Sequence, residues 1–290
     1  MRRTGLGLVL ALGLAMQMGA LAQDGEVQDR QDDVIVTARK PLDAQAARHF
    51  VHQISAATQG QIARFDAEVC PLVIGFTPDF EKLIVARILR VAKAVGAEVA
   101  KPDCRGNVVL VATDDGAALV QGLRSSRPDL FAGMQPVEIR RVIASKGPVR
   151  NWAATAVVNE DGRRPGTPGS GNLQDPQTLE VKSASFINPS SKQVIDASAV
   201  VVDSNAISGK TVIQLADYAT MRALARTRPV EDMEGIGTIL TLFDSATPPQ
   251  SVTETDVAYL KALYAMPGNR ALNYQVSRIA KGVKEASAKP

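Results

Sequence analysis

The strongest constraint on the fold of this chain is the stretch from Ala199 to Pro229, in which a buried strand leads through a polar turn into an Ala-rich helix. Residues Ala199–Asp203 are apolar up to the final carboxylate, as in a strand covered on both faces. The helix is predicted over Val212–Thr227, with Thr211 as its N-cap and Gln214 completing a capping box. Apolar side chains lie on most of its sides: Leu215, Ala216, Tyr218, Ala219, Met221, Ala223, Leu224 and Ala225. A helix of this kind is buried on several faces, so we expect it to be a central element.

The order of the predicted elements indicates an α+β fold with a mixed or antiparallel sheet packed with helices. Helices are expected from Asp43 to about Ala56, over Pro78–Val95 and over the segment that Thr253 caps. Strands are expected at Asn151–Asn159 and at Thr178–Phe186. Because these two strands follow one another without a helix between them, we expect them to pair antiparallel, which argues against a doubly wound parallel sheet.

Composition divides the chain into four parts. A signal peptide is expected at residues 1–22 and a flexible, acidic segment at residues 23–40. A single α+β domain follows over residues 41–265, and residues 266–290 are expected to form a C-terminal helix and a tail that frays after Gly282. The Gly- and Pro-rich stretch over residues 162–176 is interpreted as a mobile surface loop between two paired strands.

The N-terminus has the three parts of a secretory signal peptide. Arg2 and Arg3 supply positive charge, residues 6–18 form an apolar run, and Ala20-Leu21-Ala22 is a small-x-small cleavage motif. We expect cleavage after Ala22 and a periplasmic or secreted protein, with no membrane span in the mature chain because no later segment approaches about 20 apolar residues. Losing the two arginines lowers the net charge from +3 to about +1, so we expect no nucleic acid as a partner.

Cys70 and Cys104 are the two cysteines of the chain. In the oxidising compartment that export implies, an even number of cysteines indicates a disulfide. We therefore predict a Cys70–Cys104 bond, with two separate buried thiols as the alternative. A bond that closes a loop of about 35 residues contributes roughly 3–4 kcal/mol in the chain-entropy model.

The turn between the central strand and its helix imitates a phosphate-binding loop. It follows a strand, opens a helix and ends in Gly209-Lys210-Thr211. However, Ser204 stands where that motif requires its first glycine, and too few residues follow for the parallel strands of such a fold. We interpret Gly209 as a turn residue, Lys210 as solvated and Thr211 as the helix cap.

Other residues that often carry chemistry lack supporting partners in the sequence. His49 and His52 lie three apart on a predicted helix, but no carboxylate is spaced to complete a metal site with them. Asp114, Asp115 and Asp203 follow strands, where capping and turn roles explain them. No serine lies in a G-x-S-x-G motif. We therefore name no catalytic, cofactor-binding or metal-binding residue and expect no cofactor.

Two resemblances concern export. Residues 33–39, D-V-I-V-T-A-R, resemble a segment near the mature N-terminus of many TonB-dependent outer-membrane receptors, although this chain is too short for such a barrel. We expect the segment to join the protein's own sheet, with pairing to a partner's sheet edge as the alternative. Together with the stretch L-A-D-Y-A-x-M-R-x-L-A-R-T-R-P over residues 215–229, this start resembles a family of exported alphaproteobacterial proteins, which implies export but no particular activity.

Residues 200–264 resemble the second half of a zincin metalloprotease domain. Zincins place H-E-x-x-H on a helix that follows a strand, and their last helix often opens with a pattern that Thr253, Asp256, Val257 and Tyr264 match here. The resemblance implies a zincin-like fold.

The zinc-binding residues of a zincin are replaced in this chain. In one register Tyr218 and Arg222 stand in the places of the two histidines and Ala219 in the place of the glutamate. Shifted by one residue, the same places fall to Asp217, Tyr218 and Met221. The resemblance therefore implies a vestigial site at Asp217, Tyr218, Met221 and Arg222 that has neither imidazole ligands nor a general base. We expect Arg222 to fill part of the space of a metal, hydrogen-bonded to a carboxylate or to backbone carbonyls.

These observations predict an exported, non-catalytic protein that binds an envelope protein or another envelope component whose identity the residues do not specify. The alternative is a periplasmic hydrolase with an unrecognised active site. A deep cleft with convergent polar groups beside the helix at residues 215–226 would favour the hydrolase. A cleft filled by Tyr218, Met221 and Arg222 would favour the binding protein.

Overall fold

The computed structural model describes residues 41–166, 178–182, 188–228 and 236–288. The chain divides into two compact units between Asp33 and Val34, and every described residue belongs to the second unit. The predicted signal peptide, the segment over residues 33–39 and residues 167–176 of the predicted loop therefore lie outside the described residues.

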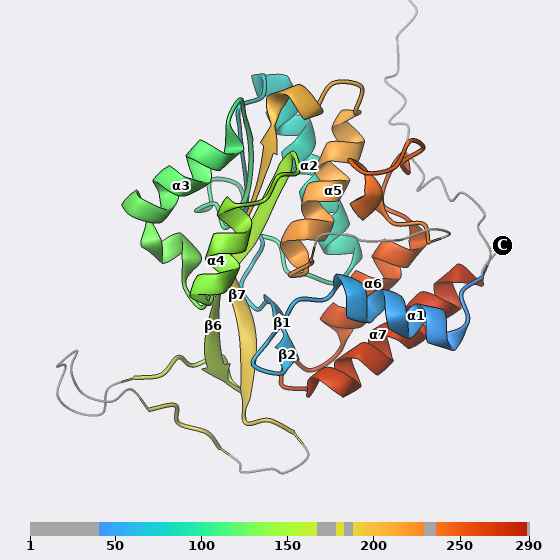
Figure 1. Ribbon diagram of the computed structural model, residues 1–290. Helices are drawn as coiled ribbons and strands as arrows, with labels where there is room; N and C mark the ends of the chain where they lie inside the picture. Colours follow the sequence, from blue (N-terminus) through green and yellow to red (C-terminus); the bar gives the residue numbers. More distant parts are fainter. Residues whose placement is uncertain (1–40, 167–177, 183–187, 229–235, 289–290) are drawn as a thin grey trace, which may run out of the picture. The chain divides into compact units, whose positions relative to one another are not determined.

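The fold is α+β, as predicted, and its mixed sheet is built around the long strand β7 (Ser191–Asp203) (Figure 1). β6 (Val149–Asn159) pairs antiparallel with β7 along one side. On the other side β3 (Arg64–Phe65) and β5 (Val108–Thr113) pair with β7 in parallel, and β4 (Pro71–Ile74) pairs in parallel with β5. β7 is central because Val200, Val201 and Val202 are buried on alternating faces, as expected for a strand covered on both sides.

Helices cover both faces of the sheet. α2 (Pro78–Ala94) and α5 (Val212–Leu224) pack together on the face that holds the main core, and α3 (Gly116–Ser126) and α4 (Pro136–Ile143) cover the other face. A smaller core on that second face contains Val120, Phe131 and Trp152. The rings of Phe131 and Trp152 are stacked, with their centres 5.1 Å apart. The remaining elements are α1 (Ala44–Ile54), the short pair β1 (Ala57–Thr58) and β2 (Gln61–Ile62), α6 (Glu254–Ala265) and α7 (Leu272–Ser287).

The predicted strand at Thr178–Phe186 is wrong for the described part of that range. Thr178 forms only an isolated bridge with Gly166, and the strand that pairs with β6 is β7, which begins at Ser191. The first half of β7 is polar in sequence, and its buried Gln193 bonds to the side chains of Gln61 and Gln59. A buried strand whose polar groups are satisfied in this way lacks the apolar pattern that predicts strands.

The C-terminal helix continues past the point where we expected it to fray. α7 runs to Ser287, and Val283 is fully buried against the core. Gly282 lies inside α7 beside Ala262 of α6, where a Cβ atom would make an ordinary contact at 3.4 Å. Gly282 therefore does not end the helix.

The predicted disulfide is confirmed. Cys70 and Cys104 are bonded, with their Cα atoms 6.1 Å apart, and the bond ties the residue before β4 to the loop that leads into β5.

Among the described residues, no helix has the length and apolar character that crossing a membrane requires.

Candidate functional site

Helix α5 is buried from Gln214 to Leu224. The predicted capping box is confirmed, since the Gln214 N–H donates to the Thr211 hydroxyl and the Gln214 side chain accepts from the Thr211 N–H. The helix ends at Leu224, before the predicted end at Thr227. Ala225 is extended, with φ −126° and ψ 129°, and the residues after it pair with the end of α1 through a bridge between Ser55 and Thr227.

Asp217, the first residue of the predicted vestigial site, forms a buried ion pair that joins three elements. Its carboxylate accepts two hydrogen bonds from the Arg87 guanidinium on α2, at 2.6 and 2.8 Å, and one from the Val252 N–H before α6, at 2.8 Å. Both partners are at least nine-tenths buried. The two parallel bonds and the backbone donor satisfy this carboxylate, so it holds α2, α5 and the start of α6 together.

Tyr218 and Arg222 contact one another on the side of α5 that faces the following chain. Arg222 Nε donates to the Tyr218 hydroxyl at 2.9 Å, and its guanidinium carbon lies 5.0 Å from the centre of the Tyr218 ring. Arg222 Nη1 also donates to the Thr227 hydroxyl at 3.2 Å and to the Arg228 carbonyl at 2.5 Å. The expected bond from Arg222 to a backbone carbonyl is therefore confirmed. Burial raises the pKa of Tyr218 and outweighs the lowering effect of Arg222. The phenol is therefore neutral at ordinary pH.

The interior beside α5 is filled. Met221 is fully buried, and the Tyr218 ring packs edge-on against Phe243 with the ring centres 5.0 Å apart. Asp217 is directed to α2, whereas Tyr218 and Arg222 contact each other and the chain after α5, so the four residues do not converge on one point. Within the described ranges, no three His, Cys, Asp or Glu side chains are grouped so that they could hold a metal ion.

The other residues that the sequence singled out take local roles. His49 and His52 are exposed on α1. Asp115 caps α3 through the Ala118 N–H, while Asp114 is exposed. Asp203 accepts from the Gly116 N–H at 2.9 Å and from Arg150 at 3.2 Å, and thereby ties the end of β7 to α3 and β6.

Gly209 has φ +77°, and Lys210 precedes the cap, so the loop that imitates a phosphate-binding motif is a turn into α5. Only glycine adopts such a backbone conformation without strain.

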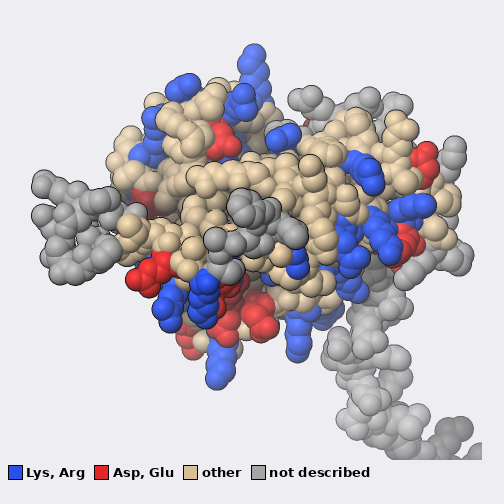
Figure 2. Space-filling view, turned by 90° about the horizontal axis from the view of Figure 1, so that it is seen from below, with Lys and Arg blue, Asp and Glu red and all other residues tan. Residues whose placement is uncertain are grey.

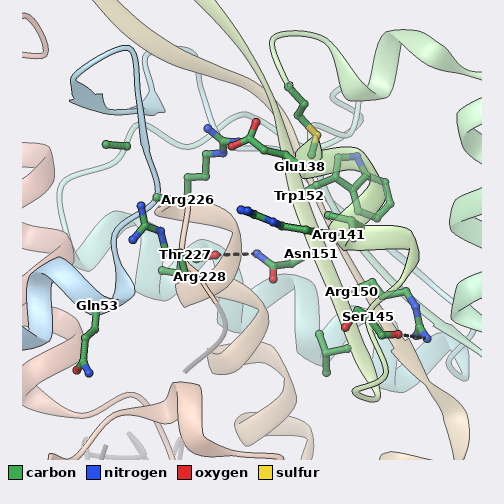
Figure 3. A pocket seen from close by; sticks show the side chains of 15 residues that line it. Gln53, Glu138, Arg141, Ser145, Arg150, Asn151, Trp152, Arg226, Thr227 and Arg228 are labelled. Carbon is green, nitrogen blue, oxygen red and sulfur yellow. Dashed lines mark hydrogen bonds and ion pairs between the residues drawn. The ribbon is translucent and has the colours of Figure 1, made fainter. Parts of the chain in front are cut away.

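A slot of about 680 Å³ lies beside β6, and no sequence pattern indicated it. We call it the β6 slot; Figure 3 shows the side chains that line it. These side chains come from the end of α1, from α4 and the residues around it, from the start of β6 and from the segment after α5: Gln53, Ala56, Ala57, Met134, Glu138, Arg141, Val142, Ser145, Val149, Arg150, Asn151, Trp152, Arg226, Thr227 and Arg228. Three stretches far apart in the chain meet here, at residues 53–57, 134–152 and 226–228.

The slot is lined by more arginines than carboxylates. Arg226 is buried and donates to Glu138 Oε1 at 2.9 Å and to the Thr58 hydroxyl. Arg150 donates to Asp203 and to the Ser145 carbonyl. Arg141 and Arg228 are exposed, and neither guanidinium is joined by a hydrogen bond or ion pair to another described residue. The slot therefore presents two cations that have no carboxylate partner among the described residues.

This excess is a local property of the slot. On the face of the molecule shown in Figure 2, basic side chains occur in several groups, with acidic side chains beside more than one of them, and do not form one continuous basic surface. The whole chain carries a net charge of only +3.

The open edge of β6 faces the slot. The Ser198 N–H on β7 donates to Asn107, on the β5 side, at 2.8 Å, so Ser198 and its opposite residue Ala153 exchange no hydrogen bonds. By the alternation of an antiparallel pair, Val149, Asn151 and Ala153 turn their N–H and C=O groups away from β7. Further along β6, the Thr155 N–H donates to the Ala132 carbonyl at 2.9 Å, which covers the edge there. Of the three residues, Val149 and Asn151 line the slot, so the uncovered backbone groups beside it are theirs.

The opposite wall of the slot is held in place by backbone pairing. The Ala56 N–H donates to the Arg226 carbonyl at 2.9 Å, and the Arg228 N–H donates to the Ile54 carbonyl at 2.8 Å. The Asn151 amide donates to the Thr227 carbonyl at 3.3 Å and links this wall to β6. The side chain of Arg228 thus projects from a fixed backbone.

Comparison of the chain with protein-family models, with curated proteins and with solved structures found no match.

Proposed function

We propose that this is an exported, non-catalytic protein that holds an extended segment of a partner protein in the β6 slot. The observation that carries the proposal is the free edge of β6, where the Val149 and Asn151 backbone groups turn away from β7 and toward the slot. An extended peptide satisfies such an edge by adding one strand to the sheet, with affinity from main-chain hydrogen bonds and specificity from the walls. Free edges otherwise invite unwanted pairing, so proteins usually cover them, as Ala132 does further along β6.

The contacts on α5 support a role other than catalysis. Tyr218 and Arg222 are engaged with each other, and Asp217 is engaged with Arg87. In a metzincin the spacing H-E-x-x-H-x-x-G-x-x-H adds a third histidine, and that place falls to Arg228 when Tyr218 and Arg222 take the first two. An arginine and a buried, hydrogen-bonded tyrosine offer zinc no ligand of the usual kind.

Export is supported by the predicted signal peptide and by the Cys70–Cys104 disulfide. Disulfides persist in oxidising compartments such as the bacterial periplasm. We propose the periplasm or the exterior as the place where the partner is met.

The test removes one edge donor without disturbing the sheet. Because the Asn151 N–H points away from β7, Asn151→Pro deletes a slot donor and leaves the β6–β7 hydrogen bonds in place. Asn151→Ala is the matched control, because it removes the bond to Thr227 but keeps the N–H. Binding to an array of random ten-residue peptides should fall at least tenfold in the proline variant and stay within threefold in the alanine variant.

Thermal melts of both variants check that the fold is intact. Binding that both variants lose equally, or an array without a single binder, would contradict edge pairing. Cleavage of the bound peptides would instead support the hydrolase alternative.

A further inference from the structure

We infer that the segment held in the β6 slot is acidic and that its carboxylates are bound by Arg141 and Arg228. This inference rests on the proposed function and names the chemistry of the partner.

Two of the four slot arginines are available to a partner. Arg226 is neutralised by Glu138, and Arg150 is neutralised by Asp203. Arg141 and Arg228 remain exposed, with no ion pair to a described residue. A neutral or basic segment in the slot would leave two cations uncompensated or repelled, whereas an acidic segment would pair them.

The two available arginines belong to opposite walls of the slot. Arg141 belongs to α4, and Figure 3 shows it reaching from that side across the slot toward the segment of Arg226, Thr227 and Arg228. Arg228 belongs to the opposite wall. Successive side chains of an extended peptide point to opposite sides, so two neighbouring acidic residues on a strand added to β6 would face the two walls.

The slot already contains one carboxylate, that of Glu138. Glu138 accepts from the Gln135 N–H with Oε2 and from Arg226 with Oε1, both at 2.9 Å. The walls of the slot therefore accommodate a carboxylate against a guanidinium. The flat guanidinium groups of Arg141 and Arg228 can bind a carboxylate through two parallel hydrogen bonds, a geometry that favours Asp and Glu side chains.

Arg140 provides an internal control. It neighbours Arg141 in sequence, is exposed on the same helix and lines a separate hollow with Arg124, between α3 and α4 and away from the β6 edge. Its removal changes the net charge of the protein as much as the removal of Arg141 does. A difference between the two variants therefore reports the slot and not the overall charge.

The experiment measures binding of the full mature chain to three acetylated ten-residue peptides by fluorescence anisotropy. One has a Glu-Glu pair at its centre among Thr and Val, and the others carry Gln-Gln or Lys-Lys at the same place. We expect the Glu-Glu peptide to bind at least tenfold more tightly than the Gln-Gln peptide, with the Lys-Lys peptide weakest. Arg141→Ala and Arg228→Ala should each weaken Glu-Glu binding about fivefold or more and reduce its salt dependence, while Arg140→Ala stays within twofold.

A charge-reversed variant tests the same assignment a second time. The double variant Arg141→Glu, Arg228→Glu should bind the Lys-Lys peptide more tightly than the Glu-Glu peptide. Equal binding of the Glu-Glu and Gln-Gln peptides would overturn the acidic preference while the proposed function stands. Equal losses in Arg140→Ala and Arg141→Ala would also overturn it, as would competition by free glutamate or inorganic phosphate at the concentration at which the peptide binds. Failure of all three peptides to bind would overturn both proposals.

Discussion

The buried arginines around α5 and the two exposed arginines of the β6 slot differ in what surrounds them. Arg87 and Arg222 are buried, and their guanidinium groups meet Asp217, Tyr218 and backbone carbonyls. Arg141 and Arg228 are exposed and meet no described carboxylate. The same residue type therefore serves the fold in one place and is free to serve binding in the other.

The physical reason for the difference is desolvation. A buried charge is tolerated only when it is paired and hydrogen-bonded, so the partners of Arg87 and Arg222 are part of the folded state. An exposed arginine keeps its water and needs no partner for folding. Substitutions around α5 should thus change stability, and substitutions in the slot should change binding.

The largest effect is expected when the buried pair is broken. Asp217→Asn removes the charge that compensates Arg87 while it keeps the shape of the side chain, and it should lower the free energy of unfolding by about 3–5 kcal/mol. Urea unfolding measures this effect. Asp79→Asn, at an exposed carboxylate on the same helix as Arg87, should change it by less than about 0.5 kcal/mol. A loss below about 1 kcal/mol for Asp217→Asn would contradict the role of the buried Arg87–Asp217 pair in the folded state.

The next effect depends on pH and concerns Tyr259, which supports the wall of the slot from within. Its hydroxyl bonds to Ser55 at 2.7 Å, and Ser55 pairs with Thr227. Burial raises the pKa of Tyr259 from 10.0 to about 12. Because the folded-state pKa is the higher one, the contribution is fully present below pH 10 and is lost as the pH rises toward 12.

The loss expected over this window is about 3 kcal/mol. Urea unfolding at pH 9 to 12 should show a smaller decline for Tyr259→Phe than for the unmodified protein. Ser55→Ala keeps the phenol and should keep the decline. Parallel stability curves for Tyr259→Phe and the unmodified protein would contradict the assignment.

A smaller effect is expected at the start of α5. Thr211→Ala removes the side-chain cap of the Gln214 N–H and should cost about 1 kcal/mol. Lys210→Ala, in the adjacent turn, should leave the unfolding free energy unchanged within about 0.5 kcal/mol. ATP binding that Lys210→Ala abolishes would show instead that the turn is a nucleotide site.

The smallest effect is expected in the slot. Arg141→Ala and Arg228→Ala should each change the free energy of unfolding by less than about 0.5 kcal/mol, since neither guanidinium has a described partner to lose. Thermal melts check this, with Arg222→Ala as the buried comparison. A large destabilisation by either slot variant would mean that the slot arginines serve the fold after all.

Local signals in the sequence predicted the elements whose determinants lie close together in the chain. The capping box of Thr211 and Gln214 and the buried central valines of β7 were predicted correctly, and the helix start predicted at Asp43 lies one residue later, at Ala44. The Cys70–Cys104 disulfide followed from cysteine count and export. Each of these depends on a few neighbouring residues or on composition.

The tertiary structure alone decided the end of α5 and the position of the slot. The apolar pattern continues through Ala225, yet the helix stops at Leu224 because the next residues pair with residues 54–56. That pairing, together with the Glu138–Arg226 ion pair, brings residues 53–57 and 226–228 to the stretch over residues 134–152, which contains α4 and the start of β6. Helix propensity and capping act over one or two turns, whereas a strand edge and its walls depend on hydrogen bonds between residues more than 70 positions apart, such as Asn151 and Thr227. The arginines that line the slot therefore look like ordinary surface arginines in the sequence, and only the fold shows which of them lack a partner among the described residues.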